Sequence, residues 1–311
     1  MEVDLQMFIT DAHCDTLRSI GVDHAAPESC AVTAQRLAQG GVGLQTFAMF
    51  AGGKGPAGTP YEDGLAMLGA IDKLGVPVYT GNLPETAPET PHGILSIEGG
   101  EMLKGDLEKL EQFDQAGRIR LIALTWNHEN EIGFPAKAGP RGHLKPFGRA
   151  LLQRMDQLGI LADVSHLNED GFWDIYDQMD LPPVASHSNC RWLCPVPRNL
   201  RKEQVRAIIE KGGFIGINFY TYFLTRRGSS NLEDVFRHID AICEMGGENV
   251  LGFGSDFDGI ESWPEGLANP ADFPALLDVL RRHGYTESVI VKIAGENFWN
   301  LLKRAEKKRL G

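Results

Sequence analysis

Short runs of apolar residues recur along the whole chain and predict buried β-strands. Runs of about four to eight residues that stop at polar or turn-forming residues are typical of strands buried in a parallel sheet. We expect eight strands, at residues 7–12, 43–50, 77–80 or 93–97, 119–125, 159–164, 183–186, 213–219 and 249–255. For the third strand, the two candidate segments stay open.

Helical patterns lie between most of these runs. They cover residues 61–75, 106–117, 147–159, 170–179, 201–213 and 231–247, and several end in glycine, as helices commonly do. Strand and helix alternate at intervals of roughly 30 residues, a spacing typical of repeated strand–helix–strand units. Residues 270–308 predict two or three further helices.

We therefore predict an α/β protein, a (β/α)8 TIM-type barrel with additional C-terminal helices, formed by a single domain over residues 1–311. An open doubly wound sheet is the alternative. The barrel is favoured by the number of strands and by polar residues that follow strands all along the chain. An open sheet would gather such residues at one switch point.

Acidic and imidazole side chains stand where several apolar runs stop. Because parallel strands bring their carboxyl ends to one rim, we expect these side chains to share a site. Three imidazoles and three carboxylates suit a pair of divalent cations. The six candidates are His13, Asp15, Glu98, His166, His187 and Asp256.

Each candidate also has a structural interpretation when it is considered alone. His13 and Asp15 would share one face of a strand, although most such pairs have no metal-binding role. Glu98 precedes two glycines, which fits either a carboxylate between two metals or one bonded to a turn. His166 and His187 could be core or cap residues. The metal interpretation is favoured because ligand-type residues stand at the same end of five strands.

Two further carboxylates leave alternatives open. Asp163 either orients a ligand imidazole or caps a turn. In the D-x-D pair Asp256 and Asp258, one residue is a ligand candidate and the other a turn residue before Gly259.

The candidate ligands indicate metal-assisted hydrolysis. Two cations about 3.5–4 Å apart would hold a shared hydroxide and polarise a substrate carbonyl. Asp256 is the candidate general base that then passes a proton to a leaving amine. No G-x-S-x-G, Walker or helix-opening G-x-G-x-x-G motif competes with this chemistry.

The composition of the chain excludes some classes of partner and indicates a cellular compartment. A net charge of −12 argues against nucleic acid and against an anionic membrane surface. The five cysteines are odd in number, so we expect no disulfide framework. No apolar stretch reaches about 18 residues and the first residues do not resemble a signal peptide, so we expect a cytoplasmic protein.

A long polar segment rich in Gly and Pro follows the fourth predicted strand. Residues 126–146 predict a loop that is a candidate substrate lid. Glu129 and Glu131 in this loop either pair with a substrate ammonium or are simply solvated.

Taken in order, the motifs resemble those of the renal (membrane) dipeptidase family of zinc peptidases. The resemblance covers nearly the whole chain and rests on DAHCDTL, SIEGGE, ADVSHLN, VASHSNCR, VPRNL, GINFY, GFGSDFDGI and GENFWNLL. It implies a (β/α)8 barrel that holds two zinc ions. In that arrangement His13 and Asp15 bind the first metal, Glu98 bridges, His166 and His187 bind the second, and Asp256 completes the set and carries a proton.

The resemblance also implies substrate contacts. Arg198 matches the arginine that holds the terminal carboxylate of the substrate, a task that suits a guanidinium fork, although a surface position is its simpler interpretation. Tyr220 lies in a stretch that approaches substrate, or it packs in the barrel. Mammalian members carry a histidine where this chain has Trp126, so either His128 polarises the scissile carbonyl or that role is absent.

The sequence therefore predicts a metal-dependent dipeptidase with two zinc ions per chain and a small peptide substrate; the resemblance also implies an L-Xaa-D-Xaa preference and a homodimer. One alternative is another barrel hydrolase that acts on lactones, cyclic amides or phosphoesters. Such enzymes usually begin with H-x-H and often use a modified lysine as the bridge, whereas this chain has H-x-D and Glu98. A second alternative is a non-catalytic binding protein derived from the barrel, which the presence of all six candidate ligands disfavours.

Overall fold

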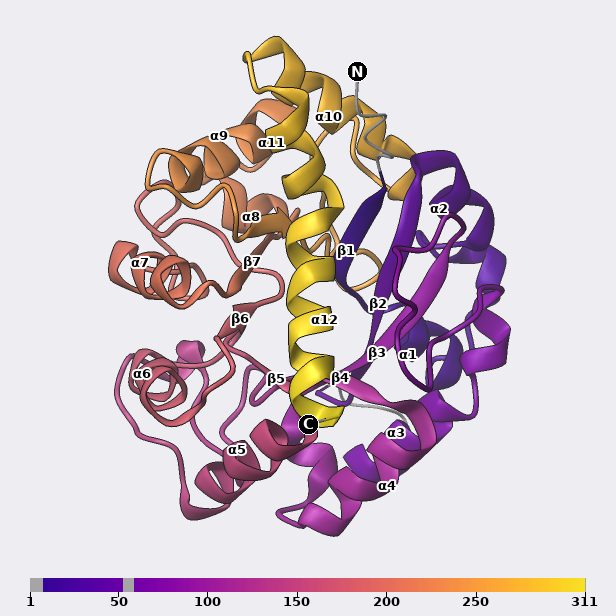
Figure 1. Cartoon of the computed structure of the whole chain (residues 1–311), viewed down its shortest axis with the longest axis vertical. Helices are drawn as coiled ribbons and strands as arrows, with labels where there is room; N and C mark the ends of the chain where they lie inside the picture. The colour runs from indigo at the N-terminus through magenta and orange to yellow at the C-terminus, as the bar shows by residue number, and fades with distance from the viewer. Residues whose placement is uncertain (1–7, 53–58, 311) are drawn as a thin grey trace.

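Eight parallel strands close into a barrel in chain order, which confirms the predicted fold class (Figure 1). The computed structural model describes residues 8–52 and 59–310. The strands are β1 Ile9–Cys14, β2 Val42–Phe50, β3 His92–Glu98, β4 Ile119–Ala123, β5 Leu161–Asp163, β6 Val184–Ala185, β7 Phe214–Ile217 and β8 Leu251–Phe253. The third strand is therefore the later candidate, and Val78 contributes only an isolated bridge to Gly93. Met7, at the start of the first predicted strand, lies outside the described residues.

Helices separate the strands and cover the outside of the barrel (Figure 1). They are α1 Thr16–Gly21, α2 Ala34–Gly40, α3 Pro60–Leu68, α4 Leu107–Gly117, α5 Pro146–Leu158, α6 Glu169–Gln178, α7 Lys202–Lys211, α8 Thr221–Leu224, α9 Leu232–Cys243, α10 Phe273–Arg282, α11 Glu287–Val291 and α12 Asn297–Leu310. Short 3-10 turns lie at Pro27–Ser29, Ile71–Leu74, Gly100–Leu103, Ala136–Ala138 and Pro270–Asp272, and a π-turn lies at Lys292–Glu296.

The helix boundaries follow local signals where those signals are strong. Asn168 caps α6 by accepting from Gly171 N, and Asn231 caps α9 in the same manner. Gly159 ends α5 with φ of 62°, a conformation that suits glycine. The predicted helix 61–75 is wrong in its second half, because α3 ends at Leu68 and a separate 3-10 turn follows.

The strands of the second half of the barrel are shorter than their apolar runs. The chain leaves the sheet soon after β5, β6 and β8, although the residues that follow are still buried. A periodicity in hydrophobicity reports burial rather than hydrogen bonding, so it overestimates the length of such strands. The polar residues after these strands thus lie in loops at the carboxyl rim.

Helix α12 covers the amino ends of the strands. Its first residue, Asn297, donates to the carbonyl of Leu251 at the start of β8. Near its other end, Glu306 accepts from Arg120 Nη1 at 2.9 Å and from Leu83 N at 2.8 Å. Both side chains of the Arg120–Glu306 pair are buried. The carboxyl ends of the strands therefore lie on the face opposite α12. No described helix is both long and apolar enough to span a membrane.

Replacing Glu306 with alanine should destabilise the barrel by about 3–5 kcal/mol, because the buried Arg120 guanidinium loses its counter-charge. Urea unfolding measures the loss. Lys307→Ala, on the exposed side of the same helix turn, is the control and should change stability by less than about 0.5 kcal/mol. A loss below about 1 kcal/mol in Glu306→Ala would show that the pair does not hold α12 in place.

Candidate metal centre

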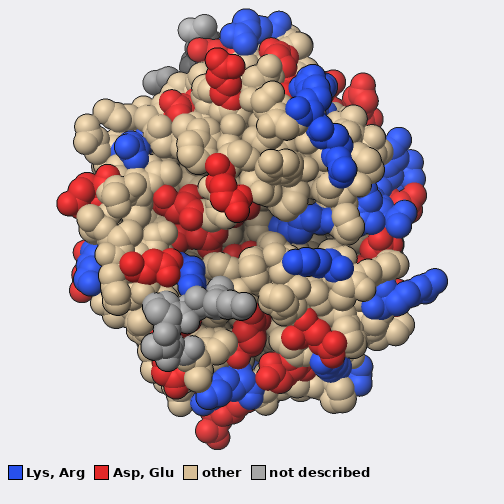
Figure 2. Space-filling model, turned by 180° about the vertical axis from the view of Figure 1, so that it is seen from behind, with Lys and Arg blue, Asp and Glu red and all other residues tan. Residues whose placement is uncertain are grey.

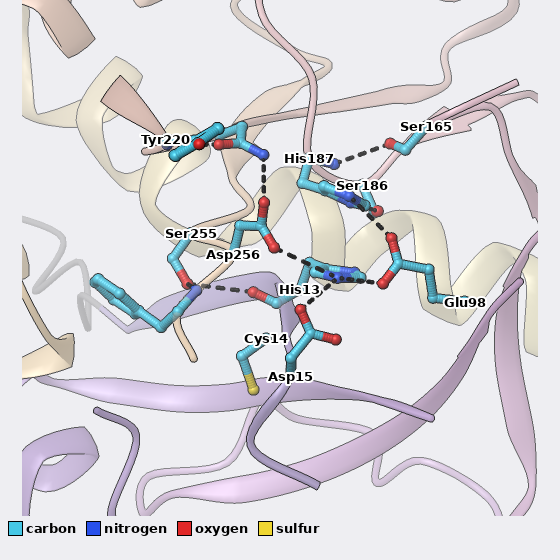
Figure 3. Close-up of polar contacts among 12 residues, drawn as sticks. His13, Cys14, Asp15, Glu98, Ser165, Ser186, His187, Tyr220, Ser255 and Asp256 are labelled. Carbon is cyan, nitrogen blue, oxygen red and sulfur yellow. Dashed lines mark hydrogen bonds and ion pairs between the residues drawn. The ribbon is translucent and has the colours of Figure 1, made fainter. Parts of the chain in front are cut away.

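The six candidate ligands come together at the carboxyl rim of the barrel. His13 lies in β1, Asp15 is the first residue after β1, and Glu98 is the last residue of β3. His166, His187 and Asp256 lie just beyond the ends of β5, β6 and β8. All six side chains are buried. The predicted convergence of remote residues is thus found, and Figure 3 shows most of the group around the His13 ring.

Glu98 stands between two sets of donor atoms. Its Oε2 lies 3.4 Å from His13 Nε2. Its Oε1 lies 3.0 Å from His166 Nε2 and 3.4 Å from His187 Nε2. One carboxylate therefore presents one oxygen to each set, which is the geometry that a bridging ligand requires.

The first set is completed by two more carboxylates. His13 Nε2 lies 3.8 Å from Asp15 Oδ2 and 3.9 Å from Asp256 Oδ1. Despite these neighbours, His13 Nε2 and Asp15 Oδ1 are buried without a hydrogen-bond partner among the described residues. Two ligand atoms bound to one zinc ion at about 2.0–2.2 Å would themselves lie roughly 3–4 Å apart. The distances and the unpartnered atoms therefore fit a cation between these side chains.

The charges of the site also fit a cation. In the part of the chain that the structure describes, no Lys or Arg nitrogen lies within ion-pair distance of Asp15, Glu98 or Asp256, and only imidazoles do. Burial, reinforced by the charges of Asp15 and Glu98, raises the pKa of Asp256 to about 8. Such mutual repulsion is what a divalent cation would relieve.

The second set consists of imidazoles that favour the neutral form. Burial, together with the Arg198 charge, lowers the pKa of His166 to about 4. Burial likewise holds the pKa of His187 well below its usual range, with the nearby His13 as the next cause. A neutral imidazole keeps a lone pair for a metal, so both rings are suited to bind one.

Two neighbouring residues fix which nitrogen of these rings carries the proton. Ser186 Oγ lies 2.7 Å from His187 Nδ1 and donates its own proton to Asp163. Asn127 Oδ1 lies 3.3 Å from His166 Nδ1 and accepts from it. Both Nε2 atoms are thereby left with their lone pairs toward Glu98.

Asp163 combines the two roles left open by the sequence. Its Oδ1 accepts from Ser165 N and Ser186 N, so it shapes the turns after β5 and β6. Through Ser186 it also orients His187, rather than His166, which follows β5 in the chain.

The two aspartates of the D-x-D pair have different partners. Asp256 belongs to the cluster and accepts from Asn218 Nδ2 at 2.8 Å. Asp258 instead accepts from Thr16 Oγ1 at 2.6 Å and from Ala31 N at 2.6 Å, so it ties the loop after α1 to the rim. A Cβ at Gly259 would lie 1.9 Å from Asp15 Oδ2, which explains why glycine follows this pair.

Backbone strain accompanies the cluster. His166 and Asp256 have φ of 67° and 65°, in the left-handed region that non-glycine residues seldom occupy. Conformations of this kind persist only where the surroundings hold them, and they are concentrated at functional sites.

Arg198 lies beside the second set of donors. Its Nη1 donates to Ser188 Oγ at 2.7 Å and its Nη2 to the carbonyl of His187 at 2.8 Å. The guanidinium also lies over the Phe223 ring and lines a pocket together with His166. It is therefore not a simple surface residue.

Tyr220 and His128 lie farther from the cluster. Tyr220 donates from its hydroxyl to Glu261 at 2.8 Å, and burial followed by Glu261 raises its pKa to about 12. His128 is exposed, and its ring centroid lies 5.7 Å from that of Trp126. Among the described contacts, none joins His128 to a candidate ligand, whereas the Trp126 ring lies 6.3 Å from that of His166.

The predicted lid loop is partly anchored. Ala136 N donates to the carbonyl of His166 at 2.7 Å, and Asn168 N donates to the carbonyl of Phe134. Glu129 pairs with Lys145 at 2.6 Å. Its side chain is also 55% exposed, so the carboxylate is solvated, and Lys145 is an additional partner.

The sequence interpretation missed three residues that orient the candidate ligands: Asn127, Ser186 and Asn218. Each is a common polar residue next to a more conspicuous one. Asn218 stands within the GINFY motif, and Ser186 directly precedes His187. Their adjacency to candidate residues was the available signal.

Comparison with known proteins identifies the family. The family model described as membrane dipeptidase, peptidase family M19, matches residues 1–310. The chain belongs to this family. An uncharacterized protein in the pqqA 5′ region of Klebsiella pneumoniae is 38% identical over 220 residues, which cover 68% of this chain and 80% of that protein. The match spans only about half the length, 52%, of an uncharacterized dipeptidase from Schizosaccharomyces pombe.

Solved structures of M19 members share the whole architecture. A metallopeptidase described as dipeptidase AC has a TM-score of 0.86 at 29% identity, with 96% of this chain and 99% of that chain covered. A metallopeptidase from Rhodobacter sphaeroides, bound to a phosphinate mimic of the dipeptide L-Ala-D-Ala, has a TM-score of 0.84 at 28% identity and the same coverage. Membership in M19 indicates a metallo-dipeptidase, and with it a metal.

Replacing Ser186 with alanine should weaken zinc binding about tenfold, because His187 loses the group that fixes its proton on Nδ1. Competition with a chromophoric chelator measures the affinity. Ser96→Ala is the matched control, since Ser96 is also a buried serine but its hydroxyl has no hydrogen-bond partner in the part of the chain that the structure describes. Equal affinity in the two variants would contradict the orienting role.

Proposed function

We propose that this M19 member is a dipeptidase that holds two divalent cations, most suitably zinc, and cleaves dipeptides with a free carboxylate. The observation that carries the proposal is the position of Glu98, whose Oε2 faces His13 and whose Oε1 faces His166 and His187. We assign His13 and Asp15 to the first cation and His166 and His187 to the second. Glu98 would bridge them, and Asp256 would complete the first set.

When bound, the cations would lower the pKa of a water molecule and polarise the scissile carbonyl. The protein's own groups then handle protons and orientation. Asp256 is held by Asn218 Nδ2 through Oδ2, which leaves Oδ1 toward the cluster. From this position Asp256 would take a proton from the attacking water and deliver it to the leaving amine.

Arg198 is the proposed anchor for the terminal carboxylate of the substrate. It lines a pocket with His166 and, within the described chain, has no carboxylate within ion-pair distance. A carboxylate bound there would bring the preceding peptide bond toward the donor sets. The L-Ala-D-Ala mimic in the R. sphaeroides neighbour supports an L-Xaa-D-Xaa preference. The cytoplasmic location, the single domain over 1–311 and the homodimer stay predictions.

The direct test is a zinc-loaded assay with stereochemically defined dipeptides, run beside lactone, cyclic amide and phosphoester substrates, together with metal analysis. The proposal expects dipeptide cleavage, no comparable turnover of the other classes and two metal ions per chain. Cleavage of lactones or phosphoesters alone would favour the rival barrel hydrolase. Metal-free protein without any turnover would favour the binding protein.

Asp256→Asn should retain the fold and most of the metal but lower turnover about 10²- to 10⁴-fold, because an amide cannot carry the proton. Steady-state kinetics, thermal unfolding and metal analysis check the three statements. Asp258→Asn serves as the control, since Asp258 only ties a loop, and the folded variant should keep most of its turnover. Rates like the wild type in Asp256→Asn would reject the proton-transfer role.

Arg198→Ala should raise KM for free dipeptides roughly 30-fold, because a partly buried carboxylate loses its cation. C-terminally amidated dipeptides lack that carboxylate and should be almost unaffected. Metal content must be measured alongside, because Arg198 also bonds the carbonyl of His187. An equal effect on both substrate types would remove Arg198 from the carboxylate pocket.

A further inference from the structure

A pocket of about 270 Å³ opens beside the second donor set, and its wall carries two cationic side chains. The residues that line it are Asn127, Ala136, Lys137, His166, Val196, Pro197, Arg198 and Phe223. No acidic residue is among them. The pocket is thus basic although the protein as a whole carries a net charge of −12.

Both cations are free of carboxylate partners among residues 8–52 and 59–310. Within the described chain, the Arg198 guanidinium donates only to a hydroxyl and a carbonyl, and its Nε is buried without a hydrogen-bond partner. Lys137 is exposed and makes no ion pair there. Lys145, in the same loop, differs in that it is paired with Glu129 at 2.6 Å.

The position of Lys137 is tied to the candidate metal centre. The turn Ala136–Ala138 carries it, and Ala136 N donates to the carbonyl of His166 at 2.7 Å. Pro135 also forms a bridge with Leu167. The backbone that bears Lys137 is therefore anchored to a candidate ligand, and the lysine does not sit at a free loop tip.

We propose that this pocket selects dipeptides whose C-terminal residue is acidic, an inference that rests on the dipeptidase function proposed above. Arg198 holds the α-carboxylate, and Lys137 pairs with the side-chain carboxylate of an Asp or Glu residue. Val196, Pro197 and Phe223 contact the intervening methylene groups. A neutral C-terminal residue would leave the Lys137 ammonium without a partner.

The charge distribution around the mouth supports this assignment. Figure 2 shows the face opposite α12, with a hollow near its centre, acidic side chains along one side and basic side chains along the other. A protein with excess negative charge disfavours ligands that carry two carboxylates unless local cations compensate. Two unpaired cations on one wall supply that compensation, and one cation would be enough for a neutral side chain.

The experiment compares kcat/KM of the zinc-loaded protein for Ala-Asp and Ala-Asn, with the C-terminal residue in both configurations. For the configuration that is cleaved, the aspartyl substrate should be favoured about twofold to fivefold, the range of an exposed ion pair. Lys137→Met should bring this ratio close to one, and Lys137→Arg should preserve it. Lys137→Glu should reverse the selectivity and favour Ala-Lys over Ala-Asp.

Arg141→Met is the matched control, because it removes one positive charge from the same loop without lining the pocket. It should leave the ratio unchanged. An unchanged ratio in Lys137→Met, or no preference in the wild type, would overturn the inference. An equal shift in Arg141→Met would also overturn it by showing a general effect of net charge.

Calorimetry separates this inference from the proposed function. The probes are N-acetylaspartate and N-acetylasparagine, which need no cleavage. If no dipeptide is turned over, the dipeptidase proposal fails. The pocket assignment is then supported if N-acetylaspartate binds more tightly and loses this advantage in Lys137→Met, and it is overturned if the two bind equally.

Discussion

Three carboxylates and three imidazoles confined to one buried cluster are the constraint on which the rim of this barrel depends. Asp15, Glu98 and Asp256 lie around Nε2 of His13, and in the described chain no Arg or Lys lies at ion-pair distance from them. Buried like charges of this kind are costly unless a cation or a proton lies between them. The same rim holds His166 and Asp256 in left-handed backbone conformations. The rest of the barrel therefore has to stabilise this cluster, because both the repulsion among its carboxylates and the backbone conformations of its residues are unfavourable.

Buried aspartates provide part of that stabilisation by linking neighbouring strands. Asp163 accepts from backbone and side chain of Ser186 and thereby joins the ends of β5 and β6. Asp11 acts in the same way between β1 and β8, where it accepts from Ser255 N at 2.8 Å and from Ser255 Oγ at 2.6 Å. Because each of these strands ends next to a candidate ligand, the bonds that close the barrel also position the cluster. Fold stability and site geometry are therefore not independent in this protein.

The barrel and the six candidate ligands could be predicted because both follow from repetition along the chain. Parallel strands bring their ends together, so an imidazole or acid after each apolar run is informative without any knowledge of contacts. The remaining features depend on three-dimensional neighbours. Val78 and Gly93 are both apolar-run residues, and only the pairing with β2 selects the later run. Each of three polar residues orients a candidate ligand through one hydrogen bond, and the spacing of residues along the chain does not reveal such a bond. They are Ser186, Asn127 and Asn218. The same holds for Glu129, whose partner Lys145 lies at the far end of a long loop.

Trp126 stands where the resemblance to mammalian members implies a histidine, and this difference changes which groups act on the substrate under the proposed function. The indole lies between two rings, with its centroid 4.9 Å from that of Phe50 and 6.3 Å from that of His166. It is therefore packed beside the second donor set. An indole offers a single N–H donor and no group that gains a positive charge near neutral pH. It cannot stabilise developing negative charge on a carbonyl oxygen as an imidazolium does. His128 is exposed, its ring centroid lies 5.7 Å from that of Trp126, and no side-chain hydrogen bond or ion pair joins it to another described residue. Polarisation of the carbonyl would then fall on the cations, while the fixed charges of the pocket, Arg198 and Lys137, would act on substrate orientation rather than on the reacting bond.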